Sequence, residues 1–199
     1  MQVIIDNRPQ YKAAGEILIE QRSYIFCILC TSHCIDLMLM DIENIHRVQK
    51  IMESAQSITR FIYNHTWILS FMRQFAEGNI LRLDVTRFAT NYKVLDSMIN
   101  KKVYLRLMLV NPEWQQSRYA RISTEGSDVE SLVTRQSFWQ WSEKIVTVIK
   151  PLYEVLRAVD GERYPQMCFL YYMMERTKKQ IKVADPQHAD EYISFINHR

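Results

Sequence analysis

The spacing of the apolar residues changes at Cys30, and this change constrains the fold more than any other feature of the sequence. Before it, Val3–Ile5 and Tyr24–Leu29 are short apolar runs rich in β-branched and aromatic residues, as strands are. After it, apolar residues recur at intervals of three and four, as on the buried face of a helix. The sequence therefore predicts two short strands near residues 2–6 and 24–29, lying side by side, and then a mainly α-helical body.

Turn residues are scarce, which supports long helices. The 199 residues include four Gly and five Pro, too few for a sandwich of many short strands. Pro9 fits the first turn of a helix between the two strands, and Asn111–Pro112 reads as an N-cap followed by proline. Ser127 and Glu130 have capping-box spacing and predict another helix start. The last predicted helix covers residues 167–181.

Composition and charge exclude several classes of protein. The formal net charge is +3 and 48% of residues are hydrophobic, which is ordinary for a folded domain and below the charge density of a dedicated nucleic-acid binder. The most apolar stretch, residues 24–40, is interrupted by His33 and Asp36, so it does not predict a membrane span. Met1 is not followed by a secretory signal, and the four cysteines are expected to be free thiols inside the cell.

Two groups of residues suggest metal chemistry. Asp6 follows a predicted buried strand, where metal-dependent phosphoryl-transfer folds hold their ions, although aspartate is also common at turns. Cys27, Cys30, His33 and Cys34 resemble a zinc cluster. They lie in one short segment without a second ligand pair, and adjacent residues of a helix point in different directions. We therefore expect buried thiols here and not zinc.

A third group has a different potential chemistry. Asp84, Arg87 and Phe88 place charge beside an aromatic ring, which could hold a base or a phosphate. The same residues could form a helix-start ion pair with Phe88 in the core. The basic run at residues 176–182 is typical of a solvated helix face. Most tryptophans fall on or near apolar stripes and are predicted mainly as core residues: Trp67, Trp114, Trp139 and Trp141.

The order of several short motifs resembles the core of hAT-superfamily transposases of the plant (Ac-like) type. These motifs are Ile4–Asn7, Tyr11–Gly15, Cys30–Leu39, Phe61–Trp67, Thr86–Thr90 and Val159–Gly161. The similarity spans roughly residues 2–184. It implies an RNase H-like fold interrupted by a helical insertion domain of unknown function. The corresponding expectation is a partial RNase H-like core at 1–44, the insertion domain at 45–184, and a C-terminal tail at 185–199.

The resemblance also implies roles for individual residues. In this family three separated acids hold two divalent ions, Mg²⁺ or Mn²⁺, for DNA strand cleavage and transfer. Asp6 matches the second acid and would be a metal ligand in a complete site. Cys30 and His33 match a Cys-x-x-His motif near the active site. Arg87 matches the arginine of an Arg-Trp motif, with Phe88 in place of the tryptophan, and this pair is the expected DNA contact.

The departures from the family pattern predict an incomplete site. The first acid is expected upstream of Met1 and the final glutamate beyond Arg199, while Arg8 places a cation beside Asp6. A two-metal site needs several converging carboxylates. We therefore expect a nuclear, transposase-derived fragment that is not an active enzyme by itself and holds no cofactor. Weak DNA binding would use basic side chains: Arg87, Arg118, Arg121 and Lys178.

The incomplete core also leaves the predicted sheet with an uncovered edge and face, which predicts self-association, or association with a full-length transposase-like protein. Two alternatives to the fragment interpretation remain. One is a non-functional remnant of a truncated element. The other is part of an active DDE-type transposase or nuclease whose missing acids come from another chain. No membrane partner is expected.

Overall fold

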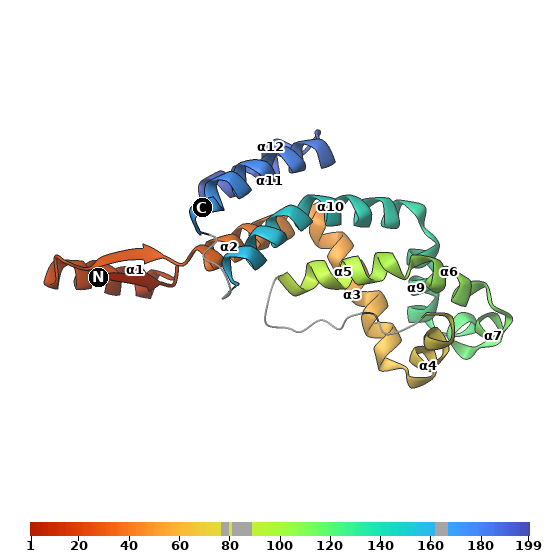
Figure 1. Ribbon diagram of the computed structural model, residues 1–199. Coiled ribbons are helices and arrows are strands. Elements are labelled where there is room, and N and C mark those ends of the chain that lie inside the picture. The colour runs from red at the N-terminus through yellow and green to blue at the C-terminus, as the bar shows by residue number, and fades with distance from the viewer. Residues whose placement is uncertain (77–79, 81–88, 162–166) are drawn as a thin grey trace. The chain divides into compact units, whose positions relative to one another are not determined.

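A computed structural model describes residues 1–76, 80, 89–161 and 167–199 (Figure 1). The described chain is mainly helical, with two short parallel strands near its N-terminus, as the sequence predicts. It divides into two compact units. One unit joins Met1–Ile42 with Pro151–Arg199, and the other is Glu43–Lys150.

The first unit begins with a β-α-β segment. Strand β1 (Gln2–Ile5) and strand β2 (Phe26–Leu29) pair in parallel, and helix α1 (Pro9–Gln21) connects them (Figure 1). Parallel neighbours need such a crossover because the chain must return to the same end of the sheet. The proline of α1 occupies its first turn, where no backbone N–H is needed. Both predicted strands and this helix start are confirmed.

Helix α1 covers one face of the two-stranded sheet. Gly15 lies against Ile5 and Cys27, and a Cβ atom at this position would stand 2.8 Å from Ile5 Cδ1. The opposite face is uncovered: Ile4 is 64% exposed and Phe26 is 68% exposed. Parallel sheets normally have both faces covered. The segment therefore presents an apolar surface that its own residues do not bury.

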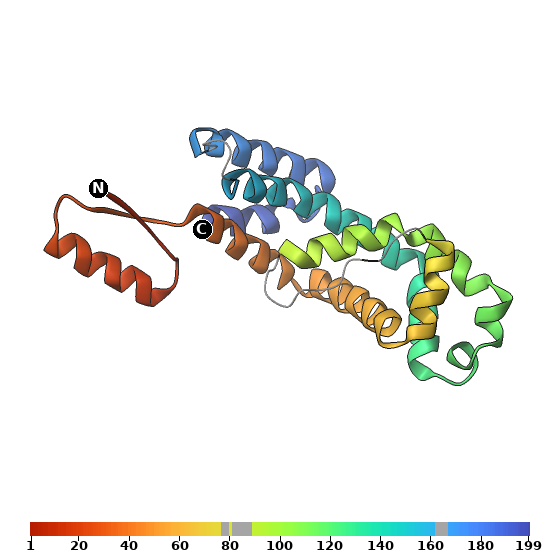
Figure 2. The same cartoon turned by 60° about the horizontal axis from the view of Figure 1, so that its bottom comes forward.

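The rest of the first unit is helical. Its elements are α2 (Thr31–Glu43, whose last residue falls in the other unit), the end of α10 (Gln136–Val159), the 3₁₀ helix η1 (Met167–Phe169), α11 (Leu170–Ala184) and α12 (Ala189–His198). Helix α11 packs on α12; Figure 2 shows this blue part of the chain from a second direction. Arg199 donates two hydrogen bonds to Asp41 on α2, at 2.9 and 3.1 Å. These bonds connect residues near both ends of the sequence.

The turn between α11 and α12 contains a buried carboxylate. Asp185 is fully buried; it contacts His188 Nδ1 at 2.9 Å and accepts a hydrogen bond from the Tyr192 hydroxyl at 3.3 Å. These contacts order the turn and begin α12. The prediction that the helix at 167–181 is the last one is therefore wrong, because α12 follows it.

The second unit consists of helices in its described part. They are α3 (His46–Asn64), α4 (Thr66–Phe75), α5 (Ala89–Asn100), α6 (Lys102–Val110), α7 (Pro112–Gln116), α8 (Arg118–Arg121), α9 (Thr124–Thr134) and the first part of α10. Helix α3 packs on α4, α5 and α9, and α6 packs on α4 and α9. Ile58 and Ile68 are completely buried between such helices. Of the residues with an assigned structure beyond residue 45, none forms a strand.

Three of the four tryptophans lie in the interior of the second unit (Glu43–Lys150, the helical unit) or at its edge. Trp114 and Trp139 are completely buried, and their indole N–H groups donate to Glu130 Oε2 at 3.0 Å and to the Val133 carbonyl at 2.7 Å. Trp141 is half-buried on α10. Trp67 does not fit the core prediction, because it begins α4 at the surface and is 41% exposed.

Two predicted helix starts have different outcomes. The Asn111 side chain accepts a hydrogen bond from the Glu113 backbone N–H and caps α7, as predicted. The capping box at Ser127–Glu130 is wrong, because α9 already begins at Thr124. Its cap is the Ser123 side chain, which accepts from the backbone N–H three residues later at 3.1 Å.

The early start of α9 depends on a close approach between neighbouring helices. A Cβ atom at Gly126 would overlap the backbone carbonyl of Tyr119. Glycine therefore lets the first turn of α9 pack directly on α8, which moves the helix start ahead of the predicted capping box. Spacing alone could not reveal this contact.

The predicted domain boundaries describe a family pattern and stay a prediction. One compact unit combines residues 1–42 with residues 151–199. The predicted boundaries at 44/45 and 184/185 divide the chain differently. Helix α10 continues through Pro151, where the residue ranges of the two units meet. Among the described helices, none is both long and apolar enough to traverse a bilayer.

Candidate functional site

The carboxyl ends of the two strands bring together the residues that the resemblance selects. Asp6 follows β1, and Cys30 follows β2 immediately before α2. The Cys30 backbone N–H donates to the Ile5 carbonyl at 2.8 Å, which ties the two chain segments together at this point. His33 lies in the first turn of α2. The local sequence thus places an acid, a thiol and an imidazole at one edge of the sheet.

Asp6 lies between two basic side chains. His33 Nε2 is 2.9 Å from Asp6 Oδ1, an ion pair when the imidazole is protonated. Arg8 Nε is 3.7 Å from Asp6 Oδ2, but the arginine is 69% exposed, so this contact is weak. Asp6 Oδ1 is buried and accepts no hydrogen bond of good geometry, so no N–H of the His33 ring is aligned with it. The structure therefore brings Asp6 and His33 together.

Asn7 extends this cluster and was not selected from the sequence as a site residue. Its Nδ2 donates to Cys34 Sγ at 3.5 Å, and its Oδ1 is buried without a hydrogen-bond partner. Burial raises the pKa of the Cys34 thiol, and the nearby Cys30 raises it further. Cys34 is therefore a neutral thiol. The position of Asn7 directly after Asp6 was the available signal.

The residues present do not fit a resident divalent ion. Asp6 Oδ1 and Asn7 Oδ1 are oxygens of the kind that Mg²⁺ or Mn²⁺ prefers. However, His33 faces one carboxylate oxygen of Asp6 and the Arg8 guanidinium faces the other, and the positive charge of Arg8 opposes a cation. In the described ranges, no three His, Cys, Asp or Glu side chains form a group that could hold a metal.

The predicted DNA contacts Arg87 and Phe88 lie outside the described residues, and so does Asp84. Their roles stay predictions. Of the other predicted phosphate contacts, Arg118 and Arg121 are exposed on α8, and Lys178 lies on α11. Lys178 donates to Glu175 at 2.8 Å.

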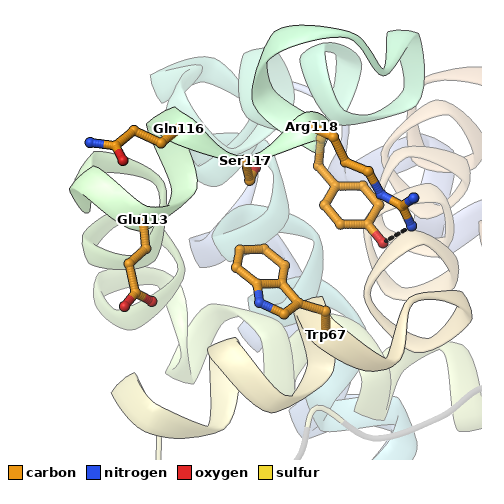
Figure 3. A pocket seen from close by; sticks show the side chains of 6 residues that line it. Trp67, Glu113, Gln116, Ser117 and Arg118 are labelled. Carbon is orange, nitrogen blue, oxygen red and sulfur yellow. Dashed lines mark hydrogen bonds between the residues drawn. The ribbon is translucent and has the colours of Figure 1, made fainter.

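A cavity in the helical unit surrounds the exposed tryptophan. Its volume is about 690 Å³, and it is lined by Trp67, Glu113, Gln116, Ser117, Arg118 and Tyr119. Figure 3 shows Trp67 across the cavity from Ser117 and Arg118. The Trp67 ring is parallel to that of Tyr119, with centroids 5.7 Å apart, and Arg118 donates to the Tyr119 hydroxyl at 2.9 Å. The cavity thus combines aromatic walls with one cation and one carboxylate.

Comparison with known proteins relates the β-α-β segment to transposases. Residues 1–58 match the family model described as Domain of unknown function (DUF659), a domain that is found in hAT-family transposases. The match contains Asp6, Cys30 and His33 and ends within α3. No curated protein and no solved structure matches the chain.

Proposed function

We propose that this chain is a hAT-transposase-derived module of the nucleus that binds DNA weakly and does not cleave it by itself. The observation that carries the proposal is the contact between Asp6 and His33, 2.9 Å apart, within the segment that matches the transposase-associated domain. In the resembled family these two positions belong to the active-site acid and the Cys-x-x-His motif. Protein interaction is the second role open to such a module.

The lack of cleavage follows from what surrounds Asp6. Two-metal strand transfer needs ions held about 4 Å apart by several carboxylates. A single aspartate offers one or two oxygen ligands, and a hard cation otherwise keeps its water. His33 and Arg8 already face the two oxygens of this carboxylate. The site is therefore set up for a charge interaction with basic side chains rather than for metal-dependent chemistry.

Weak binding to DNA is expected from exposed basic residues on the described surface. Arg118 and Arg121 are exposed on one short helix, and guanidinium groups contact phosphates well. Such contacts are independent of sequence and weaken as salt competes. The small net charge of +3 argues against tight binding.

Incubation of the purified chain with a labelled DNA duplex and Mg²⁺ or Mn²⁺ tests both parts of the proposal. We expect no cleavage or joining, and binding that falls steeply between about 50 and 200 mM salt. Asp6→Ala is the test variant, and Asp190→Ala, an exposed aspartate on α12, is the matched control. Cleavage that is lost in Asp6→Ala but kept in Asp190→Ala would contradict the proposal and indicate acids supplied by another chain.

A further inference from the structure

Helix α11 carries an exposed face that combines aromatic rings and positive charge. One row along the helix contains Tyr172, Arg176, Lys179 and Val183, all exposed. The tyrosine is 66% exposed and the valine is 82% exposed. A neighbouring row adds Tyr171, which is 80% exposed. We call these five residues the α11 face.

The charge of α11 is strongly one-sided. Its basic residues are Arg176, Lys178, Lys179 and Lys182, whereas its acidic residue is Glu175. The Lys178 ammonium group donates to the Glu175 carboxylate at 2.8 Å and lowers the pKa of that carboxyl, so the acid is neutralised by one of the lysines. The other three cations give the helix surface a net positive potential that favours an anionic partner.

The fold does not use the α11 face for its own packing. The residues that α11 buries are Thr177 and Ile181, on the side of the helix away from the row that begins at Tyr172. Helix α11 packs on α12 and on η1. Large exposed rings cost hydrophobic free energy, and a cluster of them beside cations marks an interaction surface.

The spacing of this face fits one unpaired nucleic-acid strand. Residues three or four apart on a helix lie about 5–6 Å from each other along the axis, comparable to neighbouring phosphates of an extended strand. A base can stack on Tyr172 while the following phosphates reach Arg176 and Lys179. Stacking of this kind needs a free base face, which a paired duplex does not offer.

The same features argue against a lipid surface. A membrane-binding helix has a continuous apolar side and a separate basic side. On the α11 face, Arg176 and Lys179 stand in the same row between Tyr172 and Val183, and the apolar Ile181 on the other side of the helix is already buried. Insertion into lipid would bury these two cations.

We propose that the α11 face binds an unpaired DNA strand, with Tyr171 and Tyr172 stacking on bases and with Arg176 and Lys179 contacting phosphates. This inference rests on the proposed DNA-binding function and names the strand form and the residues that it uses. It is independent of the Asp6 cluster.

Fluorescence anisotropy with a labelled oligothymidine of about 20 nucleotides, spanning more than one typical binding site, tests the inference on the full chain. Replacing both tyrosines by alanine should weaken binding about tenfold or more, whereas replacing both by phenylalanine should preserve it. The control is Tyr104→Ala, which removes a tyrosine that is 42% exposed on α6. It should bind as the unchanged chain does.

The salt dependence provides a second measurement that does not depend on the tyrosines. Each phosphate contact on a single strand contributes about 0.7 to the slope of log K against log salt, so the Arg176→Gln/Lys179→Gln variant should lower the slope by about 1.4. Lys50→Gln, an exposed lysine on α3, is the matched control and should leave the slope unchanged.

Four results would overturn the inference. In the first, the variant with both tyrosines replaced by alanine binds oligothymidine as tightly as the unchanged chain. If the chain still binds duplex DNA in that case, the proposed function stands and only the inference about the α11 face fails. Another is an unaltered salt slope in the Arg176→Gln/Lys179→Gln variant. The third is loss of binding to phosphatidylserine vesicles, but not to oligothymidine, in the α11 variants. The fourth is markedly tighter binding of oligouridine than of oligothymidine, which would assign the face to RNA. If the chain binds neither strand nor duplex, the proposed function fails as well.

Discussion

The β-α-β segment at the N-terminus and the helical unit at Glu43–Lys150 solve the burial of apolar side chains in different ways. In the helical unit, Trp114 and Trp139 are completely buried and their N–H groups are hydrogen-bonded. In the β-α-β segment, Phe26 is 68% exposed and Ile4 is 64% exposed. Helices surround one another, whereas one helix covers one face of a two-stranded sheet.

The helical unit therefore provides most of the stability of the chain, whereas the candidate site lies beside the less buried β-α-β segment. Buried apolar surface is the main favourable term in folding, and it is concentrated in the helical unit. The polar cluster of Asp6, Asn7 and His33 lies instead where the β-α-β segment, with its uncovered sheet face, meets the start of α2. Changes in the helical unit should therefore alter stability most, and changes in the β-α-β segment should alter association more than stability.

The largest expected effect is on the close contact between α8 and α9. Gly126→Ala would place a methyl group on the backbone carbonyl of Tyr119, and a backbone atom cannot move aside as a side chain can. We expect a loss of about 3 kcal/mol in the free energy of unfolding, as for other overpacked interiors. Urea denaturation followed by circular dichroism measures it.

Gly161→Ala is the control for this substitution. The nearest atoms to a Cβ at Gly161 are the Ala158 and Arg157 carbonyl oxygens, both 3.4 Å away, so the change should be within about 1 kcal/mol. If Gly126→Ala is tolerated as well as Gly161→Ala, the helical unit is less tightly packed than the comparison requires.

An intermediate effect is expected from pH, through Glu43. Burial raises the pKa of this carboxyl to about 7, although a hydrogen bond from Asn91 Nδ2 at 3.1 Å opposes the shift. Because the folded state binds this proton more tightly than the unfolded state, the contribution of Glu43 to stability is fully present below about pH 4.5, the usual pKa of a glutamate. This contribution, roughly 2 kcal/mol for a partly exposed group, should be lost as the pH rises from there through about 7.

Thermal unfolding between pH 4.5 and 8 measures this dependence. Glu43→Gln keeps a polar group beside Asn91 but does not titrate, so its melting temperature should vary less with pH. The control is Glu53→Gln, a change in an exposed glutamate that accepts a hydrogen bond from Gln49, and it should keep the profile of the unchanged chain. If the melting temperature of Glu43→Gln varied with pH as much as that of the unchanged chain does, the pH dependence would belong to another group.

A substitution on the uncovered sheet face is expected to change stability least, but it should change the association of the chain with itself. Phe26→Ser removes the most exposed ring of β2 and should alter the free energy of unfolding by no more than about 0.5 kcal/mol. It should also reduce self-association at tens of micromolar in sedimentation velocity, because exposed apolar strands invite pairing.

Ile122→Ser is the matched control in the helical unit. Ile122 is 83% exposed, yet it stands alone after a short helix and does not belong to a sheet. Its replacement should leave the sedimentation profile unchanged. A monodisperse monomer for the unchanged chain would remove the basis of this prediction.

The strands and most helices could be predicted because their signals are local. Pro9, Asn111 and the spacing of apolar residues fix helix starts and faces within a few positions. The start of α9 could not be predicted, since it depends on the contact of Gly126 with Tyr119, residues on different helices. Helix α12 was missed for another reason: the contacts of Asp185 with His188 and Tyr192 are local, but the sequence does not show that this carboxylate is buried.

The residues of the candidate site could be selected from the sequence, but their grouping around Asp6 was implied only by the resemblance. Asp6 and His33 are far apart in sequence, and strand pairing is what brings them to 2.9 Å. Asn7 could be noticed only because it follows Asp6 directly. The sequence does not show that its side-chain oxygen is buried without a hydrogen-bond partner. Trp67 was expected in the core because it follows a helical spacing, which identifies a face but not what covers it.

Because the ribosome synthesises the chain from its N-terminus, the two units can complete their folding at different times. Residues 43–150 form one unit from consecutive sequence, so they can fold as soon as they leave the exit tunnel. The other unit joins residues 1–42 with residues 151–199. At about 5–20 residues per second, its first half waits on the order of ten seconds for its second half. During that interval the apolar sheet face is accessible to chaperones, while the α11 face does not yet exist.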